Sequence, residues 1–229
     1  MSRAEDRRFR ERYLERDKLV KAALGRVAKA SKWRKHGDTL FQQWSDKFLA
    51  VHIAHRDGSS DEILVTAQVD VRPMAADELL WNILDVPKDE RGKLSLRVAS
   101  AFACCGVPVS FSEWSIAAFE RDAANDLEMS LQKAVNALDG GSFSQLCAEH
   151  LGGASNLQAY PRSDTLWITF VCALIMEREF QTAERILEVF ERNDWGLVSS
   201  FYATPERVDT FGGYPRMFTF TQMARNYMG

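Results

Sequence analysis

Several features that define well-known protein classes are scarce or missing in this sequence. Four cysteines in 229 residues are too few for the disulfide framework of a secreted domain. The longest apolar run, at residues 166–176, is shorter than the roughly 20 residues that a membrane-spanning helix needs. Charged residues follow Met1 closely, and no secretory signal is recognisable. The sequence therefore predicts a cytoplasmic protein that does not contact a membrane.

Composition places the chain among ordinary folded proteins. Hydrophobic residues make up 46% and charged residues 27%, close to the averages of globular domains. This balance excludes a disordered chain, a collagen-like chain and a coiled-coil rod. The length fits one large domain or two small ones.

The charges are distributed unevenly along the chain. Residues 1–35 contain 13 lysines and arginines but five acids, whereas residues 36–229 contain 16 basic and 27 acidic residues. A basic segment on an acidic body can attract an anionic partner such as nucleic acid. It can also be a solvated helix in which acids and bases pair four residues apart. Both interpretations stay open at this stage.

The first segment predicts a helix over residues 5–31. Its apolar residues Val20, Leu24 and Val27 recur at helical spacing, so this half is expected to dock on the body of the protein. Residues 1–17 have few apolar side chains and are predicted to form a charged helical extension.

A sheet is predicted in residues 39–103, interrupted by a helix at residues 74–84. The four expected strands are residues 39–44, 48–56, 63–71 and 94–103. The third shows the clearest alternation of apolar and more polar residues, which is typical of a strand with one buried face. Pro73 ends it, because proline has no amide hydrogen for the ladder.

The second half of the chain is predicted to be helical over residues 113–193. The expected helices cover residues 113–138, 142–151, a segment beginning at residue 163 or 164, and residues 180–190. Residues 194–229 form a tail without an assigned structure. Strands followed by helices predict an α+β fold, with an antiparallel sheet of about four strands packed with the N-terminal helix and the helical C-terminal half. A single domain over residues 1–229 is favoured, and a boundary near Gly140 and Gly141 stays open.

The histidines and cysteines form no recognisable metal motif. His52 and His55 are three residues apart on a strand, so they point to opposite faces and cannot bind one ion together. The cysteines are the vicinal pair Cys104 and Cys105, and the separate Cys147 and Cys172, which match no zinc spacing. Buried, hydrophobic roles are expected for them, with a redox role for the vicinal pair as the alternative.

Other motifs of catalysis are also missing. The acidic pairs Asp77/Glu78 and Asp89/Glu90 are expected to be solvated on turns or helix surfaces. No glycine-rich phosphate loop, nucleophile elbow or metalloprotease motif is present. Residues 178–184 lie between two apolar helices and predict an αα-hairpin. We therefore predict no catalytic, cofactor-binding or metal-binding residue, and the partner-binding residues are unknown at this stage.

The order of the predicted elements resembles the bacterial family of unknown function DUF4304. The residues that carry the resemblance are the turn Trp33–Phe41, the strands Phe48–His55 and Ile63–Val71, and the helix Asp126–Leu138, within residues 18–151. The resemblance transfers no catalytic residue. Because members of such families often lie beside polymorphic toxins, it implies an immunity-protein role as an expectation.

Three functional hypotheses follow. The first is a non-catalytic bacterial protein that binds a basic, toxin-like protein partner, to which an acidic surface would be attracted. The second is a nucleic-acid-binding protein that uses the basic residues 1–35. The third is an enzyme whose catalytic groups converge from distant parts of the sequence, in the cleft between helices and sheet.

Overall fold

The computed structural model of the chain describes residues 3–58, 62–89, 91, 97–98, 103–151, 164–192 and 220–229. The chain divides into two units, which we describe separately. Unit 1 contains Met1–Trp44, Phe48–Val71 and Pro108–Asn136, and unit 2 contains Ser45–Lys47, Arg72–Val107 and Ala137–Gly229. The single domain over residues 1–229 stays a prediction.

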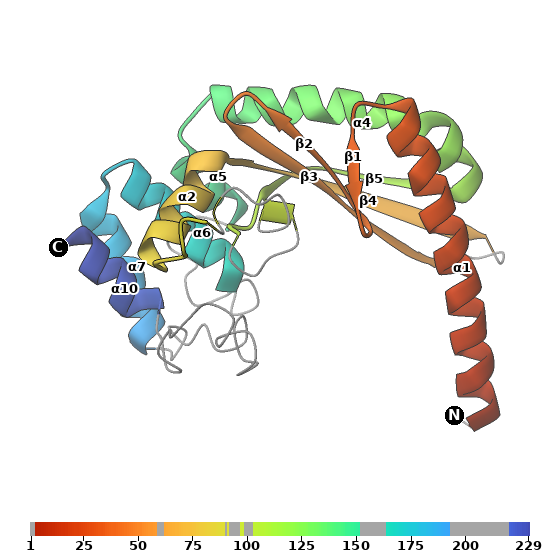
Figure 1. The fold of residues 1–229 in the computed structure, drawn as a ribbon, viewed down its shortest axis with the longest axis horizontal. Coiled ribbons are helices and arrows are strands. Elements are labelled where there is room, and N and C mark those ends of the chain that lie inside the picture. Colours follow the sequence, from red (N-terminus) through yellow and green to blue (C-terminus); the bar gives the residue numbers. More distant parts are fainter. Residues whose placement is uncertain are drawn as a thin grey trace. The chain divides into compact units, whose positions relative to one another are not determined.

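The described residues form seven helices and five strands (Figure 1). The strands are β1 (Arg34–His36), β2 (Thr39–Trp44), β3 (Lys47–Asp57), β4 (Ile63–Pro73) and β5 (Val107–Ser115). The helices are α1 (Arg3–Ala30), α2 (Met74–Ile83), α4 (Ile116–Asp139), α5 (Phe143–His150), α6 (Asp164–Met176), α7 (Phe180–Arg192) and α10 (Phe220–Met228). The predicted α+β fold is confirmed. Among these helices, none is both long and apolar enough to cross a membrane.

The strands form one antiparallel sheet in the order β1-β2-β3-β4-β5, so strands that follow one another in the sequence are neighbours. β1 pairs with β2 in the register that sets Arg34 opposite Phe41. The sheet therefore has β1 at one edge and β5 at the other.

Two helices of unit 1 lie on the same face of this sheet. Arg56 of β3 and Glu113 of β5 form an ion pair, so their side chains point to one face. Side chains alternate along a strand, which places the neighbouring His55 and Trp114 on the opposite face. There His55 contacts α1 and Trp114 contacts α4. The two helices also meet each other, because Arg26 of α1 pairs with an acidic residue of α4.

The docked and the projecting halves of α1 match the sequence prediction. Val20, Leu24 and Val27 are buried. Residues 10–15, in contrast, are exposed. Figure 1 shows the first half of α1 extending past the sheet. The apolar residues thus determine which part of α1 packs against the rest of unit 1.

Unit 2 is built around α6, which packs against α2, α5 and α7. Residues 166–175 of α6 are almost all buried, as the helix with apolar residues on every side predicted. The turn before α7 contains Arg178 with a φ of 62°, and it closes the expected αα-hairpin. Ser142 caps α5 by accepting a hydrogen bond from the backbone nitrogen of Gln145. The helix boundaries of this half were therefore largely readable from the sequence.

Two predictions of secondary structure were wrong. Arg97 and Val98 are helical, although a strand was expected at residues 94–103, and the rest of that segment up to residue 102 lies outside the described residues. The strand is β5 instead, whose last residues were assigned to the following helix. The tail, which had no assignment from the sequence, contains α10, while residues 193–219 lie outside the described residues.

Candidate functional site

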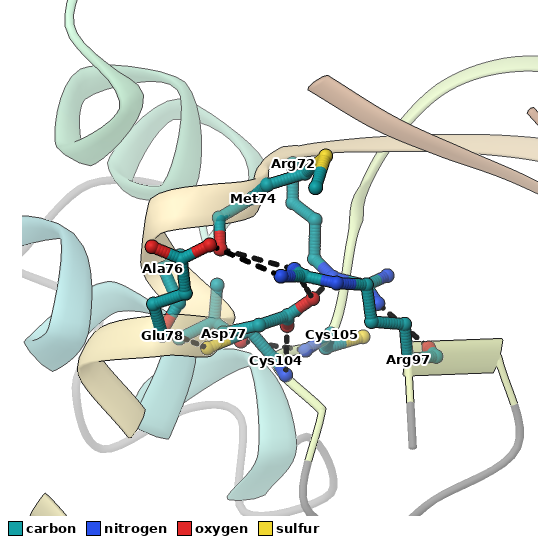
Figure 2. Close-up of polar contacts among 9 residues, drawn as sticks. Arg72, Met74, Ala76, Asp77, Glu78, Arg97, Cys104 and Cys105 are labelled. Carbon is teal, nitrogen blue, oxygen red and sulfur yellow. Dashed lines mark hydrogen bonds and ion pairs between the residues drawn. The ribbon is translucent and has the colours of Figure 1, made fainter. Parts of the chain in front are cut away.

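The most concentrated group of ionisable side chains lies in unit 2 and surrounds Asp77 (Figure 2). The prediction that Asp77 is solvated was wrong, because its side chain has no exposed surface. The physical reason is that Asp77 lies on the buried side of α2, where Leu80 and Trp81 follow it at helical spacing. Glu78, the other member of the predicted pair, is more than half exposed, as expected.

Two arginines and a backbone amide saturate the Asp77 carboxylate. Its Oδ1 atom accepts hydrogen bonds from Nε of Arg72 and from the backbone nitrogen of Cys104, both at 2.9 Å. Its Oδ2 atom accepts one from Nη1 of Arg97, also at 2.9 Å. Because Asp77 is in the first turn of α2, the helix dipole stabilises its negative charge further.

Both arginines also make contacts with groups other than Asp77. Arg97 donates to the carbonyl oxygen of Met74 and to Glu78, and its guanidinium lies 4.6 Å from the centre of the Trp81 ring. Arg72 donates to the carbonyl oxygen of Arg97. We define these five side chains, Arg72, Asp77, Glu78, Trp81 and Arg97, as the Asp77 network. Its two positive and two negative charges balance, which is the pattern of a structural cluster that joins distant segments of the chain.

The cysteines lie close to this network but are poorly suited to nucleophilic chemistry. Cys104, Cys147 and Cys172 are buried and Cys105 is half-buried, so the expected hydrophobic role is confirmed for three of the four. The pKa of Cys104 is raised well above its ordinary value, first by a hydrogen bond with Cys172 and then by burial. Burial likewise raises the pKa of Cys147. A raised pKa keeps a thiol protonated, and the protonated form is the unreactive one.

His52 and His55 point to opposite faces of β3, as the sequence predicted. His55 faces α1, where its ring lies 5.1 Å from that of Tyr13. His52 is on the other face, with its Nε2 atom 3.2 Å from the buried carboxylate of Asp70. Within the part of the chain that the structure describes, no group of three or more histidine, cysteine and acidic residues is placed to hold a metal ion.

The remaining acidic pair has the expected surface position where it is described. Asp89 is exposed, while Glu90 lies outside the described residues. Gly140 and Gly141, where the sequence left a domain boundary open, are exposed after α4.

The clearest surface suited to a partner lies in unit 1, on the sheet face opposite α1 and α4. We call it the open sheet face. By alternation from the Arg56–Glu113 pair, it carries His52, Ala54 and Arg56 from β3, and Val109, Phe111 and Glu113 from β5. The side chain of Phe111 is 68% exposed, the highest value among the large hydrophobic residues of the described chain. Single exposed apolar residues are ordinary on protein surfaces, so Phe111 is a candidate contact only together with the polar side chains beside it.

Most acidic residues that follow β5 in the sequence lie on α4, which packs on the opposite face of the sheet. Pro108–Asn136, the part of unit 1 that contains β5 and most of α4, holds five acidic and two basic residues. The exposed Glu128 and the partly exposed Asp122 lie on α4. This segment therefore favours a positively charged partner.

Several basic residues of α1 form ion pairs within unit 1. Arg7 pairs with Glu11 and Lys21 with Asp17, each at a spacing of four residues. Arg16 forms an ion pair with the end of β3. This arrangement is the one expected of a solvated helix with mixed charges. Arg34, Lys35 and His36 of β1, in contrast, are all exposed.

Comparison with known proteins gives no assignment. No protein-family model matches the chain, no curated protein matches it, and no solved structure matches it.

Proposed function

We propose that this chain is a non-catalytic binding protein for a basic protein partner. The observation that carries the proposal is the exposed Phe111 on a strand whose surrounding segment is acidic. An aromatic anchor supplies binding free energy when its surface is buried, and surrounding charges of one sign speed the encounter with an oppositely charged protein. The Asp77 network and the raised pKa values of the Cys104 and Cys147 thiols are consistent with this proposal, because these groups are hydrogen-bonded or buried inside unit 2.

The specific form of the proposal is an immunity protein that covers a toxin. The resemblance to DUF4304 motivates it, since families of that kind often lie beside polymorphic toxins. A nuclease-like toxin has a basic surface for its nucleic-acid substrate, and an acidic protein can cover that surface.

Charge reversal tests the proposal. The tagged chain is used to capture proteins from nuclease-treated lysate of its host, in low and in high salt. One bait carries Asp122→Lys and Glu128→Lys on α4, and a matched control carries Glu149→Lys and Glu188→Lys on exposed positions of unit 2. Both baits have the same net charge, so a difference between them reports the position of the charges.

We expect one protein with more lysine and arginine than acidic residues to be retained by the wild type and by the control. It should be lost from the α4 variant and in high salt, because screening weakens attraction between exposed charges. Equal retention by both charge-reversed baits, or capture of an acidic protein alone, would contradict the proposal.

A second candidate function has one observation in its favour. Arg34, Lys35 and His36 form an exposed basic edge at β1, next to the end of α1, as a nucleic-acid-binding surface would require. Affinity for a labelled duplex of 20 base pairs should then fall with salt with a slope of about −0.9 for each phosphate neutralised. Replacing Arg34 and Lys35 by alanine should reduce that slope. Affinity that does not depend on these residues eliminates this candidate.

A further inference from the structure

We propose that His55 controls, in a pH-dependent way, how firmly α1 is held: when its imidazole is protonated, it binds the carboxylate of Asp17 and holds the first half of α1 on β3. This inference goes beyond the proposed function and requires no partner. It concerns the place where the apolar contacts of α1 end.

The Nε2 atom of His55 is buried without a hydrogen-bond partner. The side chain of His55 is only 9% exposed, and its ring lies 5.1 Å from that of Tyr13 on α1. A buried polar atom without a partner is costly, and native structures contain few of them. The site therefore stores a hydrogen bond that is not made in this arrangement.

The group that can complete this bond is the carboxylate of Asp17. Its Oδ1 atom lies 4.0 Å from Nε2 of His55, which is beyond hydrogen-bond distance but within reach of a small rotation of either side chain. Lys21 binds the other oxygen, Oδ2, at 2.9 Å. The carboxylate can therefore contact Lys21 and His55 through different atoms.

Protonation makes Nε2 of His55 a donor with a positive charge. In the neutral ring only one of the two nitrogens carries a hydrogen, so a bond from Nε2 depends on the tautomer. In the protonated ring both nitrogens donate, and a hydrogen bond between ionised groups is stronger than one between neutral groups. Burial of the cation opposes this gain, and the negative charge of Asp17 offsets it.

The pair lies where the docked half of α1 ends. Val20 and Leu24 are buried, and Asp17 is on the same side of the helix, about one turn before Val20. Residues 10–15, which precede it, are exposed. A bond between His55 and Asp17 therefore extends the held part of α1 by about one turn towards its start.

The other charged groups described around this pair keep their charge where imidazole titrates. Arg16 pairs with Asp57, which lies on the same face of β3 as His55. Lys21 also lies 3.7 Å from Asp38, the residue before β2. The residues on this face at the start of β4 are apolar and buried, namely Ile63 and Val65. Imidazole changes charge between about pH 5 and 8, where carboxylates, guanidinium and ammonium groups stay charged. The added hold on α1 is therefore present at the acidic end of this range and lost as the pH rises.

Amide hydrogen exchange of the full chain at about pH 5.5 and about pH 7.5 tests the inference, with each rate divided by that of an unfolded peptide at the same pH. We expect residues 10–16 to be about two- to fivefold more protected at the lower pH, the factor that corresponds to a partly exposed ion pair. The difference should disappear in His55→Gln and in Asp17→Asn. It should persist in His52→Gln, the matched control, whose histidine is on the same strand but on the opposite face.

Nitrogen-15 NMR of the imidazole rings follows the protonation of His55 directly. Imidazole signals of His55 that are the same at both pH values overturn the inference. So does a pH difference in protection that His55→Gln leaves unchanged, or lower protection of residues 10–16 at the lower pH. If His55→Gln does not fold, Asp17→Asn decides, because it changes the helix and leaves the strand intact. None of these results bears on the proposed function, which uses β5 and α4.

Discussion

Atom Oδ2 of Asp77 lies 2.9 Å from Nη1 of Arg97, and Asp77 has no exposed surface. The two residues are 20 positions apart in the sequence, and Arg72 joins them from the end of β4. This ion pair links the start of α2 to a segment that precedes β5. A buried carboxylate with two buried arginines is therefore a structural requirement of unit 2 rather than a candidate acid or base.

Removal of the Asp77 charge should destabilise the protein strongly. Asp77→Asn removes the buried carboxylate that Arg72 and Arg97 share, and breaking a buried ion pair in this way costs about 3–5 kcal/mol. Urea unfolding followed by circular dichroism measures the change. Glu78→Gln is the control, and it should cost less than about 1 kcal/mol because Glu78 is largely exposed. Equal effects of the two substitutions would show that burial of the carboxylate does not determine how much stability is lost when its charge is removed.

Stability should fall at alkaline pH because of the buried thiols. The folded state raises the pKa of Cys104 and Cys147 above the ordinary value of 9.0. Above that value the unfolded chain loses these protons while the folded chain keeps them, so the stabilising contribution, complete below pH 9.0, declines as the pH rises.

Each such thiol should contribute a slope of about 1.4 kcal/mol per pH unit in this range. Urea unfolding at several pH values measures the slope, and Cys147→Ala should reduce it. If the slope is identical in Cys147→Ala and in the wild type, the Cys147 thiol does not contribute to the pH dependence of stability.

The cap of α5 offers a local test of the helix boundary. Ser142 accepts a hydrogen bond from the backbone nitrogen of Gln145, so Ser142→Ala should cost about 1 kcal/mol. Ser142→Gly should cost only a few tenths of a kcal/mol, roughly, because glycine is itself tolerated at this position. Thermal unfolding of the two variants gives the comparison. Equal destabilisation by alanine and glycine would contradict the assignment of the Ser142 hydroxyl as the cap of α5.

Phe111 should contribute little to stability. Its ring is 68% exposed, so Phe111→Ser should change the free energy of unfolding by less than about 0.5 kcal/mol. Phe119→Ala, at a fully buried position on α4, should cost about 3–5 kcal/mol. Chemical unfolding of both variants provides the measurement. If Phe111→Ser were as destabilising as Phe119→Ala, any loss of binding would reflect misfolding rather than a missing contact.

Much of the fold could be predicted because the decisive signals are local. The alternation at residues 63–71 identifies β4, and the stripe of Val20, Leu24 and Val27 identifies the docked half of α1. Ser142 marks the start of α5 in the same way. Each signal depends on neighbours within a few residues.

Two features of the structure were missed for different reasons. Asp77 was assigned to the surface because it is charged, although Leu80, Trp81 and Leu84 continue its face of α2. Its partners Arg72 and Arg97 lie outside α2, so the helical periodicity of the sequence does not relate them to Asp77.

β5 was missed although its residues alternate. Val109, Phe111 and Glu113 lie on one face, and Ser110, Ser112 and Trp114 lie on the other. The apolar residues at 94–103 gave a stronger strand signal nearby, and β propensity depends on the neighbouring strand and on burial, which the sequence does not show.

The most direct test of the account is photocrosslinking from position 111. A photoreactive phenylalanine analogue replaces Phe111 in the full chain, and the same analogue replaces Phe180 in the control. Both proteins are irradiated in host lysate treated with nuclease, and mass spectrometry identifies the products. The account predicts that one basic protein crosslinks from position 111, that it does not crosslink from position 180, and that Asp122→Lys with Glu128→Lys abolishes the product. The same products from both positions, or no protein product from position 111, would contradict it.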